Sequence, residues 1–226
     1  MKEALQKLQT YTWGDDRNSL KPIDEAIVAS HGDESARNEI EMALIEVLKS
    51  DATRNGKDYV CRKLKIIGTD ASVPTLASML GDDNHSHMAR FALQSIPGEA
   101  ASNVLIDALG DSSIPDELKV GIIGSLGARG DNSAVAPLSK LLAGGNSQLA
   151  TAAANALGAI RTTDAAKLLA SAEPNDAVMN ATLCCAEGML RSGDKAGAKA
   201  IYQKLLTSKT KQFKLAATRG VLACAK

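Results

Sequence analysis

Apolar and polar positions recur with a helical period through the stretch 117–146, ELKVGIIGSLGARGDNSAVAPLSKLLAGGN. In its first half the apolar residues fall three apart, at Val120, Ile123 and Leu126. This spacing predicts a helix that ends when Gly127 takes the left-handed conformation. A second apolar stripe within 135–142 predicts a second helix. One such hairpin cannot bury its single apolar stripe alone, so the pattern predicts that neighbouring hairpins stack beside it.

The same pattern returns along the chain. The predicted first helices are followed by Gly68, Pro97, Gly127 and Gly158, which lie 29, 30 and 31 residues apart. The predicted second helices correspond as well, because SVPTLASML and AVAPLSKLL are separated by two repeats. A spacing of this size, sustained over several copies, is typical of a helical repeat array.

The regularity of the pattern divides the chain into three parts of one continuous array. We expect a helical entry region at 1–50, repeats at 51–175, and a divergent, longer repeat with a final helix at 176–226. Aromatic residues make up only 3% of the chain, while alanine and leucine are abundant. Thin helices that pack closely through small side chains suit this composition, which predicts an all-α fold.

Two segments resemble HEAT repeats of the short type first described in bilin lyases: VGIIGSLGARGDNSAVAPLSKLL and ATAAANALGAIRTTDAAKLLA. The resemblance covers about 57–172, whereas 176–226 has glycine, alanine and tyrosine placed as in a tetratricopeptide-like hairpin. It implies a right-handed α-solenoid, a superhelix of about 14 helices stacked as antiparallel pairs, with the second helices on a concave surface. Proteins of this kind act as scaffolds or binding modules, and similar arrays occur in large exported bacterial proteins beside carbohydrate-active or haem-binding modules. A bacterial multidomain parent is therefore expected.

By register, seven polar residues on the exposed side of the second helices form the expected binding surface. They are Thr75, Ser78, Asn103, Asp107, Ser139, Lys140 and Lys167. The expected partner is a protein or another domain of the parent chain. Because no catalytic set is assembled in the sequence, we expect a non-catalytic protein without a cofactor.

The densest polar cluster, DDNHSHMAR at 82–90, offers the one candidate for an enzyme or an enzyme accessory of the lyase or carbohydrate-active type. A loop could bring His85, His87 and Asp83 onto one metal ion. The alternative, which we favour, is that Asp83, Asn84 or Ser86 caps the helix that follows.

Charge is distributed unevenly although the formal net charge is zero. Residues 1–50 carry 6 basic and 10 acidic groups, and 191–226 carry 9 and 1. The basic residues of the second region are Arg191, Lys195, Lys199, Lys204, Lys209, Lys211, Lys214, Arg219 and Lys226. They form either a solvated helix face or a surface for nucleic acid or another anionic ligand. Nucleic acid is the weaker alternative, because packing would claim Tyr202 and Phe213, the aromatics of this region.

Trp13 is the only tryptophan, and we expect it to seal the end of the array rather than to serve as an exposed anchor. Asp15 and Asp16, beside Arg17, indicate a turn with local pairing. Of the adjacent pair Cys184 and Cys185, one is expected in the core and the other at a helix contact.

No apolar stretch reaches the roughly 20 residues that span a bilayer, and no signal peptide is evident. We therefore expect no membrane insertion. We expect the protein to be cytoplasmic if the chain is complete, whereas it could be exported if the chain was cut from a larger protein. The final helix has no second helix after it, which predicts a cut chain or a partner at this end. The sequence leaves the oligomeric state and the partner open.

Overall fold

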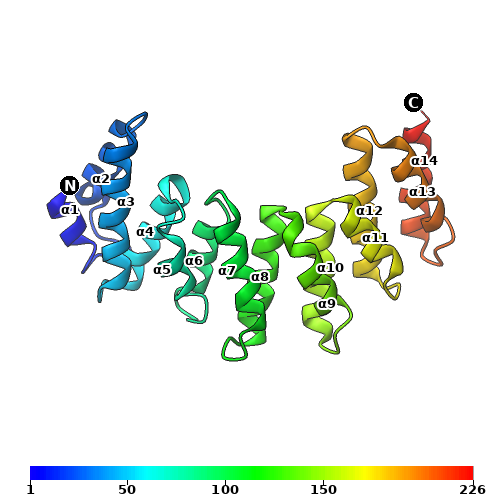
Figure 1. Ribbon diagram of the computed structural model, residues 1–226, viewed down its shortest axis with the longest axis horizontal. Coiled ribbons are helices and arrows are strands. Elements are labelled where there is room, and N and C mark those ends of the chain that lie inside the picture. The colour runs from blue at the N-terminus through cyan, green and yellow to red at the C-terminus, as the bar shows by residue number, and fades with distance from the viewer. Residues whose placement is uncertain (226) are drawn as a thin grey trace. The chain divides into compact units, whose positions relative to one another are not determined.

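The computed structural model describes residues 1–225. This part of the chain contains fourteen α-helices and two short 3-10 helices, and no strand forms in it. The all-α solenoid that the repeat pattern predicts is confirmed, since the helices stack side by side as hairpins within each unit of the chain (Figure 1). Within the described range, no helix is both long enough and apolar enough to cross a bilayer.

The chain forms two compact units. Unit 1, Met1–Ile122, contains α1 (Lys2–Lys7), η1 (Arg17–Leu20), α2 (Lys21–Ala29), α3 (Glu34–Lys49), α4 (Arg54–Ile67), α5 (Val73–Ala77), α6 (Ser86–Leu93) and α7 (Glu99–Gly110). Unit 2 begins at Ile123, inside α8 (Asp116–Arg129), and contains η2 (Asn132–Ala134), α9 (Val135–Leu142), α10 (Ser147–Ile160), α11 (Thr163–Ser171), α12 (Asp176–Arg191), α13 (Lys195–Leu205) and α14 (Lys211–Cys224). The division predicted at residues 50 and 175 stays a prediction.

In unit 1 the helices form two layers. The first helices of successive repeats, α4 and α6, pack against each other, and so do the second helices α5 and α7. Leucines from both layers are fully buried between them, at Leu64, Leu76, Leu93 and Leu105. The apolar stripe of each hairpin is thus covered by the next hairpin, as the repeat pattern requires.

In unit 2 the first helix α10 packs against α12, and α12 packs against α13 and α14. The second helices α9 and α11 are also in contact. The buried side chains include Leu126, Leu138, Leu157 and Leu169. These are the apolar positions of the repeat pattern, so the period read from the sequence identifies the core of this unit.

The role predicted for Gly127 is wrong. Helix α8 continues past it to Arg129, and Gly130 takes the left-handed conformation, with φ +75°. Gly158 likewise lies inside α10, which ends where Arg161 adopts φ +59°.

Close packing explains both glycines. A Cβ added to Gly127 would lie 2.9 Å from the Cα of Ala156, and one added to Gly158 would lie 2.7 Å from the Cα of Ala181. Real Cβ atoms do not approach backbone carbons so closely. Glycine at these two positions therefore allows α8, α10 and α12 to pack with their backbones close together.

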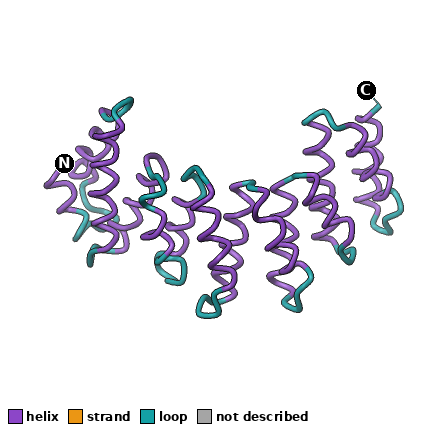
Figure 2. The backbone as a smooth tube through the Cα atoms, viewed as in Figure 1, coloured by secondary structure: helices purple, strands orange, loops and turns teal. Residues whose placement is uncertain are grey.

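Short loops join the helices (Figure 2). Among the described residues, six α-helices begin with an N-cap side chain that accepts a backbone N–H of the first turn, and these caps are Asp33, Thr53, Asn146, Thr162, Asn175 and Asp194. Each cap satisfies a backbone N–H that has no partner within the helix. These caps therefore help to fix the residues at which the six helices begin.

Candidate binding surfaces

Four of the seven predicted binding residues lie on the second helices of unit 1. Thr75 lies in α5 and Ser78 follows it, while Asn103 and Asp107 lie in α7, which packs beside α5. Thr75 is half-buried and the other three are exposed. Asn103 and Asp107 are four residues apart and share one helix face. The structure therefore brings the four onto the accessible surface of neighbouring helices, and their role in binding stays a prediction.

The other three predicted residues lie in unit 2. Ser139, half-buried, and Lys140, exposed, belong to α9, and the exposed Lys167 belongs to α11, which contacts α9. The Nζ of Lys167 lies 3.5 Å from Oδ1 of Asp164, and both side chains are largely exposed. An exposed pair of this kind is weak, so Lys167 can exchange it for a partner's carboxylate.

A pocket of about 490 Å³ opens beside Ser139 in unit 2. Parts of α9, α10, α11 and α12 line it, with the half-buried Leu142 and Leu168 among its apolar residues and Ser139, Ser171 and Glu173 among its polar ones. The apolar pattern does not predict this pocket, because a single stripe within 135–142 would bury Leu142 against the neighbouring hairpins. A signal was present: Leu141 and Leu142 are adjacent, and adjacent helical side chains cannot point in the same direction.

Glu41 of α3 is only 1% exposed, and sequence analysis did not single it out. Its carboxylate accepts the Thr69 backbone N–H (2.7 Å), the Thr69 hydroxyl (2.9 Å) and the Ser72 hydroxyl. These bonds hold the turn between α4 and α5. A pocket of about 450 Å³ lies alongside, with Arg37 and Lys65 in its lining. The signal in the sequence is that Glu41 precedes Leu44 by three residues and Leu48 by seven, on the apolar stripe.

The cluster at 82–90 forms a capped turn. Asp82, rather than the predicted Asp83, Asn84 or Ser86, accepts the backbone N–H groups of Asn84 (2.7 Å) and His85 (3.2 Å). The bond from the Asn84 N–H is the main cause of the lowered pKa of Asp82. Asp82 lies three residues before His85, the N-cap residue of α6, and the side chain of His85 makes no capping hydrogen bond.

The suggested metal ligands are not assembled. Asp83 and His87 are exposed and His85 is half-buried, with its Nδ1 3.2 Å from Oδ1 of Asp82. Among residues 1–225, no three side chains of His, Cys, Asp or Glu lie close enough together to hold a metal ion.

Two buried polar atoms near this turn have no hydrogen-bond partner, Oδ1 of Asp58 and Nε2 of His85. Asp58 belongs to α4, and His85 precedes α6, which packs against α4. Burial raises the pKa of the Asp58 carboxyl, and the charges of Arg54 and Arg62 and of the nearby histidines oppose this in part. The contact between α4 and α6 thus encloses a carboxylate with incomplete hydrogen bonding, which costs stability.

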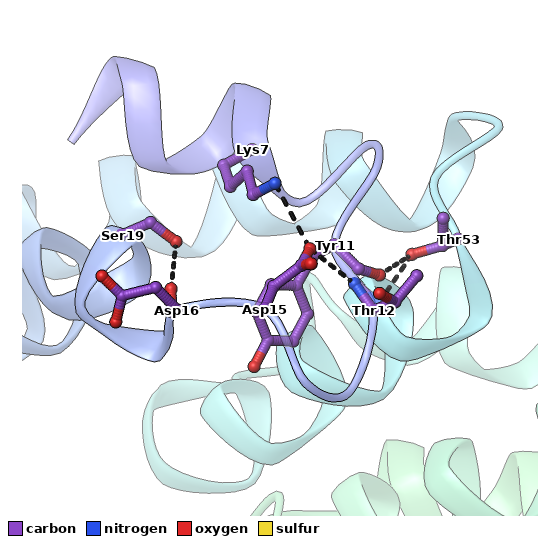
Figure 3. Close-up of polar contacts among 8 residues, drawn as sticks. Lys7, Tyr11, Thr12, Asp15, Asp16, Ser19 and Thr53 are labelled. Atoms are coloured by element: carbon purple, nitrogen blue, oxygen red, sulfur yellow. Dashed lines mark hydrogen bonds and ion pairs between the residues drawn. The ribbon is translucent and has the colours of Figure 1, made fainter.

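Trp13 does not seal the array, because its side chain is 54% exposed. Tyr11 is the buried aromatic of this region, and the two rings meet edge to face with their centroids 6.0 Å apart. The Tyr11 carbonyl oxygen accepts the hydroxyl of Thr53, the cap of α4 (Figure 3). Trp13 is therefore available as an exposed anchor.

The carboxylates that follow Trp13 take part in local pairing, as expected, but not with Arg17. Asp15 accepts the Thr12 backbone N–H (3.1 Å) and lies 3.2 Å from the Nζ of Lys7 (Figure 3). The first of these bonds is the main cause of the lowered pKa of Asp15. Asp16 caps η1 by accepting the backbone N–H of Asn18 (2.9 Å).

The cysteines are unpaired, and all four lie within the described residues. Cys185 is in the core, where its thiol lies 3.7 Å from the carbonyl oxygen of Leu157, and Cys184 is half-buried. Burial raises the pKa of both Cys185 and Cys61 to about 12. These thiols are protonated at neutral pH, a form that is a poor nucleophile.

The basic C-terminal stretch is exposed on α13, on α14 and in the loop between them, at Lys195, Lys199, Lys204, Lys209, Lys211, Lys214 and Arg219. Arg191 lies 3.6 Å from Glu187, and Lys226 falls outside the described residues. Tyr202 is buried, as predicted, and Phe213 is half-buried. A surface for single-stranded nucleic acid would need exposed aromatic rings, and these two offer little.

The sequence matches no protein-family model and no curated protein. Similar solved structures include an engineered protein (TM-score 0.43, 18% identity, 90% of this chain and 95% of that chain). Human deoxyhypusine hydroxylase in complex with glycerol is another (TM-score 0.40, 15% identity, 98% and 97%). A third is a designed armadillo repeat protein in complex with the peptide (KR)4 (TM-score 0.35, 15% identity, 98% and 98%). These TM-scores are low, so the fold assignment rests on the helices of the chain itself.

Proposed function

We propose that this helical repeat protein is a non-catalytic scaffold, and that it binds a protein partner or another domain of its parent through the second-helix surface. The observation that supports this is the pocket beside Ser139, which has Leu142, Leu168 and Glu173 in its lining. Binding sites in proteins commonly combine an apolar interior with a few polar groups. An apolar side chain of the partner would occupy the pocket, and Lys140 would meet a carboxylate outside it.

The same proposal has three further parts: the chain belongs to the short HEAT repeats, it is of bacterial origin, and it is part of a larger protein. They rest on the residues that resemble this repeat. A lyase-type or carbohydrate-active enzyme would need several reactive side chains close together. The turn at 82–90 is the candidate position for such a group of side chains. Metal analysis of the purified protein tests that alternative, because a stoichiometric metal would favour an enzyme.

Affinity capture from a lysate of the source organism tests the scaffold, with captured proteins identified by mass spectrometry at low and high salt. The bait variant Ala143→Trp fills the pocket at an exposed lining position, and Ala128→Trp on α8 is its matched control at an exposed position outside the pocket. A captured protein that is lost with Ala143→Trp and kept with Ala128→Trp supports binding at the pocket. A captured protein that Ala143→Trp still binds contradicts binding at the pocket.

The charge reversals Lys140→Glu and Asp107→Lys examine the surface in each unit separately. Both side chains are exposed, so neither change should alter the free energy of unfolding by more than about 0.5 kcal/mol. A partner that uses the second helices of one unit should bind about tenfold more weakly to the corresponding variant. Unchanged affinity for both variants would exclude these charges from the interface.

A further inference from the structure

Helix α14 exposes its large side chains and buries its small ones. Leu215 is 52% exposed and Leu222 is 62% exposed, and their separation of seven residues, two helical turns, places both on one face. On the buried side lie Ala217 and Gly220, and a Cβ added to Gly220 would lie 2.4 Å from the ring of Tyr202. Leu215 and Leu222 thus form an exposed apolar strip on α14, and contiguous exposed apolar surface can mark an interaction site.

The preceding first helix, α12, shows the opposite arrangement. It buries Val178, Leu183 and Met189 against its neighbours. Its exposed residues include Asn180 and Glu187, which are polar. Helix α14 therefore has an apolar face that the described chain leaves uncovered, and that face is bordered by Lys211, Lys214 and Arg219.

Unit 1 has an exposed surface of complementary character on α2 and α3. On α3, the residues Glu39, Met42 and Glu46 are exposed and fall at intervals of three and four, on one face. On α2, Val28 is 75% exposed, and Glu25 lies one turn before it. Each helix thus presents an exposed apolar side chain with a carboxylate one turn away, and Glu46 also lies 3.0 Å from the Nζ of Lys49 on its own helix.

The two surfaces fit each other in charge. The region 191–226 carries 9 basic residues and 1 acidic residue, and 1–50 carries 6 basic and 10 acidic. We infer that α14 of one copy packs against α3 and α2 of a second copy, with Leu215 and Leu222 against Met42 and Val28. Lysine and arginine of α14 then face the glutamates of α2 and α3, as in helix pairs held by flanking charges.

Such an interface is heterologous, because the two surfaces in contact are different. A copy that joins through one face keeps its other face free, so the assembly always has one free α14 face and one free α3 face, and association continues as concentration rises. Phosphate binding would give no role to the exposed leucines, and for this reason a second copy fits α14 better than nucleic acid does.

Sedimentation velocity across a concentration series, from about 1 to about 100 µM, measures the association at low salt. The expected result is a mean mass that increases with concentration and falls when salt screens the charges. The double variant Leu215→Glu and Leu222→Glu, defective in α14, should be monomeric. So should the double variant Glu39→Lys and Glu46→Lys, defective in α3.

An equimolar mixture of the two variants is the decisive sample. Each contributes one intact face, so the mixture should form a dimer that grows no further. Ile66→Glu, at an exposed position on α4, is the matched control and should associate like the wild type. Circular dichroism checks that every variant is folded.

Four outcomes would overturn the inference. They are a wild type that stays monomeric at the highest concentration, an α3 variant that still associates, an α14 variant that still associates, and a mixture that stays monomeric. The second would indicate that α14 pairs with itself. Binding of a DNA or RNA oligonucleotide by a monomeric wild type would assign the basic face to nucleic acid instead.

Discussion

Successive first helices meet through polar groups in unit 1 and through glycine and alanine in unit 2. In unit 1, the contact between α4 and α6 includes the buried Asp58 and His85, and the turn after α4 is held by Glu41. In unit 2, Gly127 lies against Ala156 and Gly158 against Ala181. The same repeat pattern therefore supports two kinds of contact. One encloses carboxylates, and the other depends on the absence of a single Cβ atom.

The two contacts should respond to different substitutions. Closely packed backbones leave no space for a side chain, so added volume should be most harmful in unit 2. A buried carboxylate must keep its donors, so loss of a hydrogen bond should be most harmful in unit 1.

The largest effect is expected from Gly158→Val in α10. The new side chain would collide with the backbone of Ala181, and we expect the free energy of unfolding to fall by about 3 kcal/mol. Urea unfolding followed by circular dichroism measures it. Gly124→Ala in α8 is the matched control: nothing lies within 4 Å of its new Cβ, so better helix propensity should stabilise by about 0.5 to 1 kcal/mol. Equal effects at both glycines would refute the close-packing role.

The next effect is expected from Glu41→Ala in α3. It leaves the donors of Thr69 and Ser72 without their acceptor, which should cost about 2 kcal/mol in the same urea experiment. Glu39→Ala, at an exposed position on the same helix, should change stability by less than about 0.5 kcal/mol. If both variants unfold at the same urea concentration, the turn does not depend on Glu41.

The smallest effect is expected from Asp58→Asn, and it should depend on pH. Burial raises the pKa of Asp58 in the folded chain above its usual 3.8, so the folded state holds the proton more tightly than the unfolded state does. The wild type therefore loses stability as pH rises through this window. The variant cannot ionise, and it should be more stable than the wild type near pH 7 by up to about 1 kcal/mol.

The gain should vanish near pH 3, where the wild-type carboxyl is protonated in both states. Thermal unfolding of both proteins across the pH range measures the difference. Asp51→Asn, at an exposed position, is the control and should show no such trend. A constant difference between Asp58→Asn and the wild type at all pH values would mean that ionisation of Asp58 is not the cause.

The helices and their core could be predicted from the sequence because one apolar stripe recurs in every repeat. The pattern places Gly68 directly after a first helix, and α4 does end at Ile67. The roles of Gly127 and Gly158 could not be predicted in the same way. A glycine that ends a helix and one that allows close packing both follow an apolar stripe. Only the position of Ala156 or Ala181, a repeat later, distinguishes them.

The candidate surfaces were predicted less completely. Register places Lys140 and Lys167 on the exposed side of their helices, where the structure has them. The pocket at Leu142 depends on how far α9 and α11 lie apart, and no local pattern encodes that distance. The burial of Glu41 could have been predicted, since a carboxylate on an apolar stripe needs hydrogen-bond partners. Its donors could not, because Thr69 and Ser72 lie in the turn between α4 and α5, far from α3 in the sequence.

Helix α10 makes the glycine–alanine contact on both of its sides. Its Ala156 packs against Gly127 of α8, and its Gly158 packs against Ala181 of α12. A duplicated copy of α10 and α11 would therefore find a compatible neighbour on either side. Tandem duplication of this segment could lengthen the array by whole repeats without any compensating substitution. A gene that encodes such a helix can gain repeats in single steps, and the surface that the array offers to partners would grow with it.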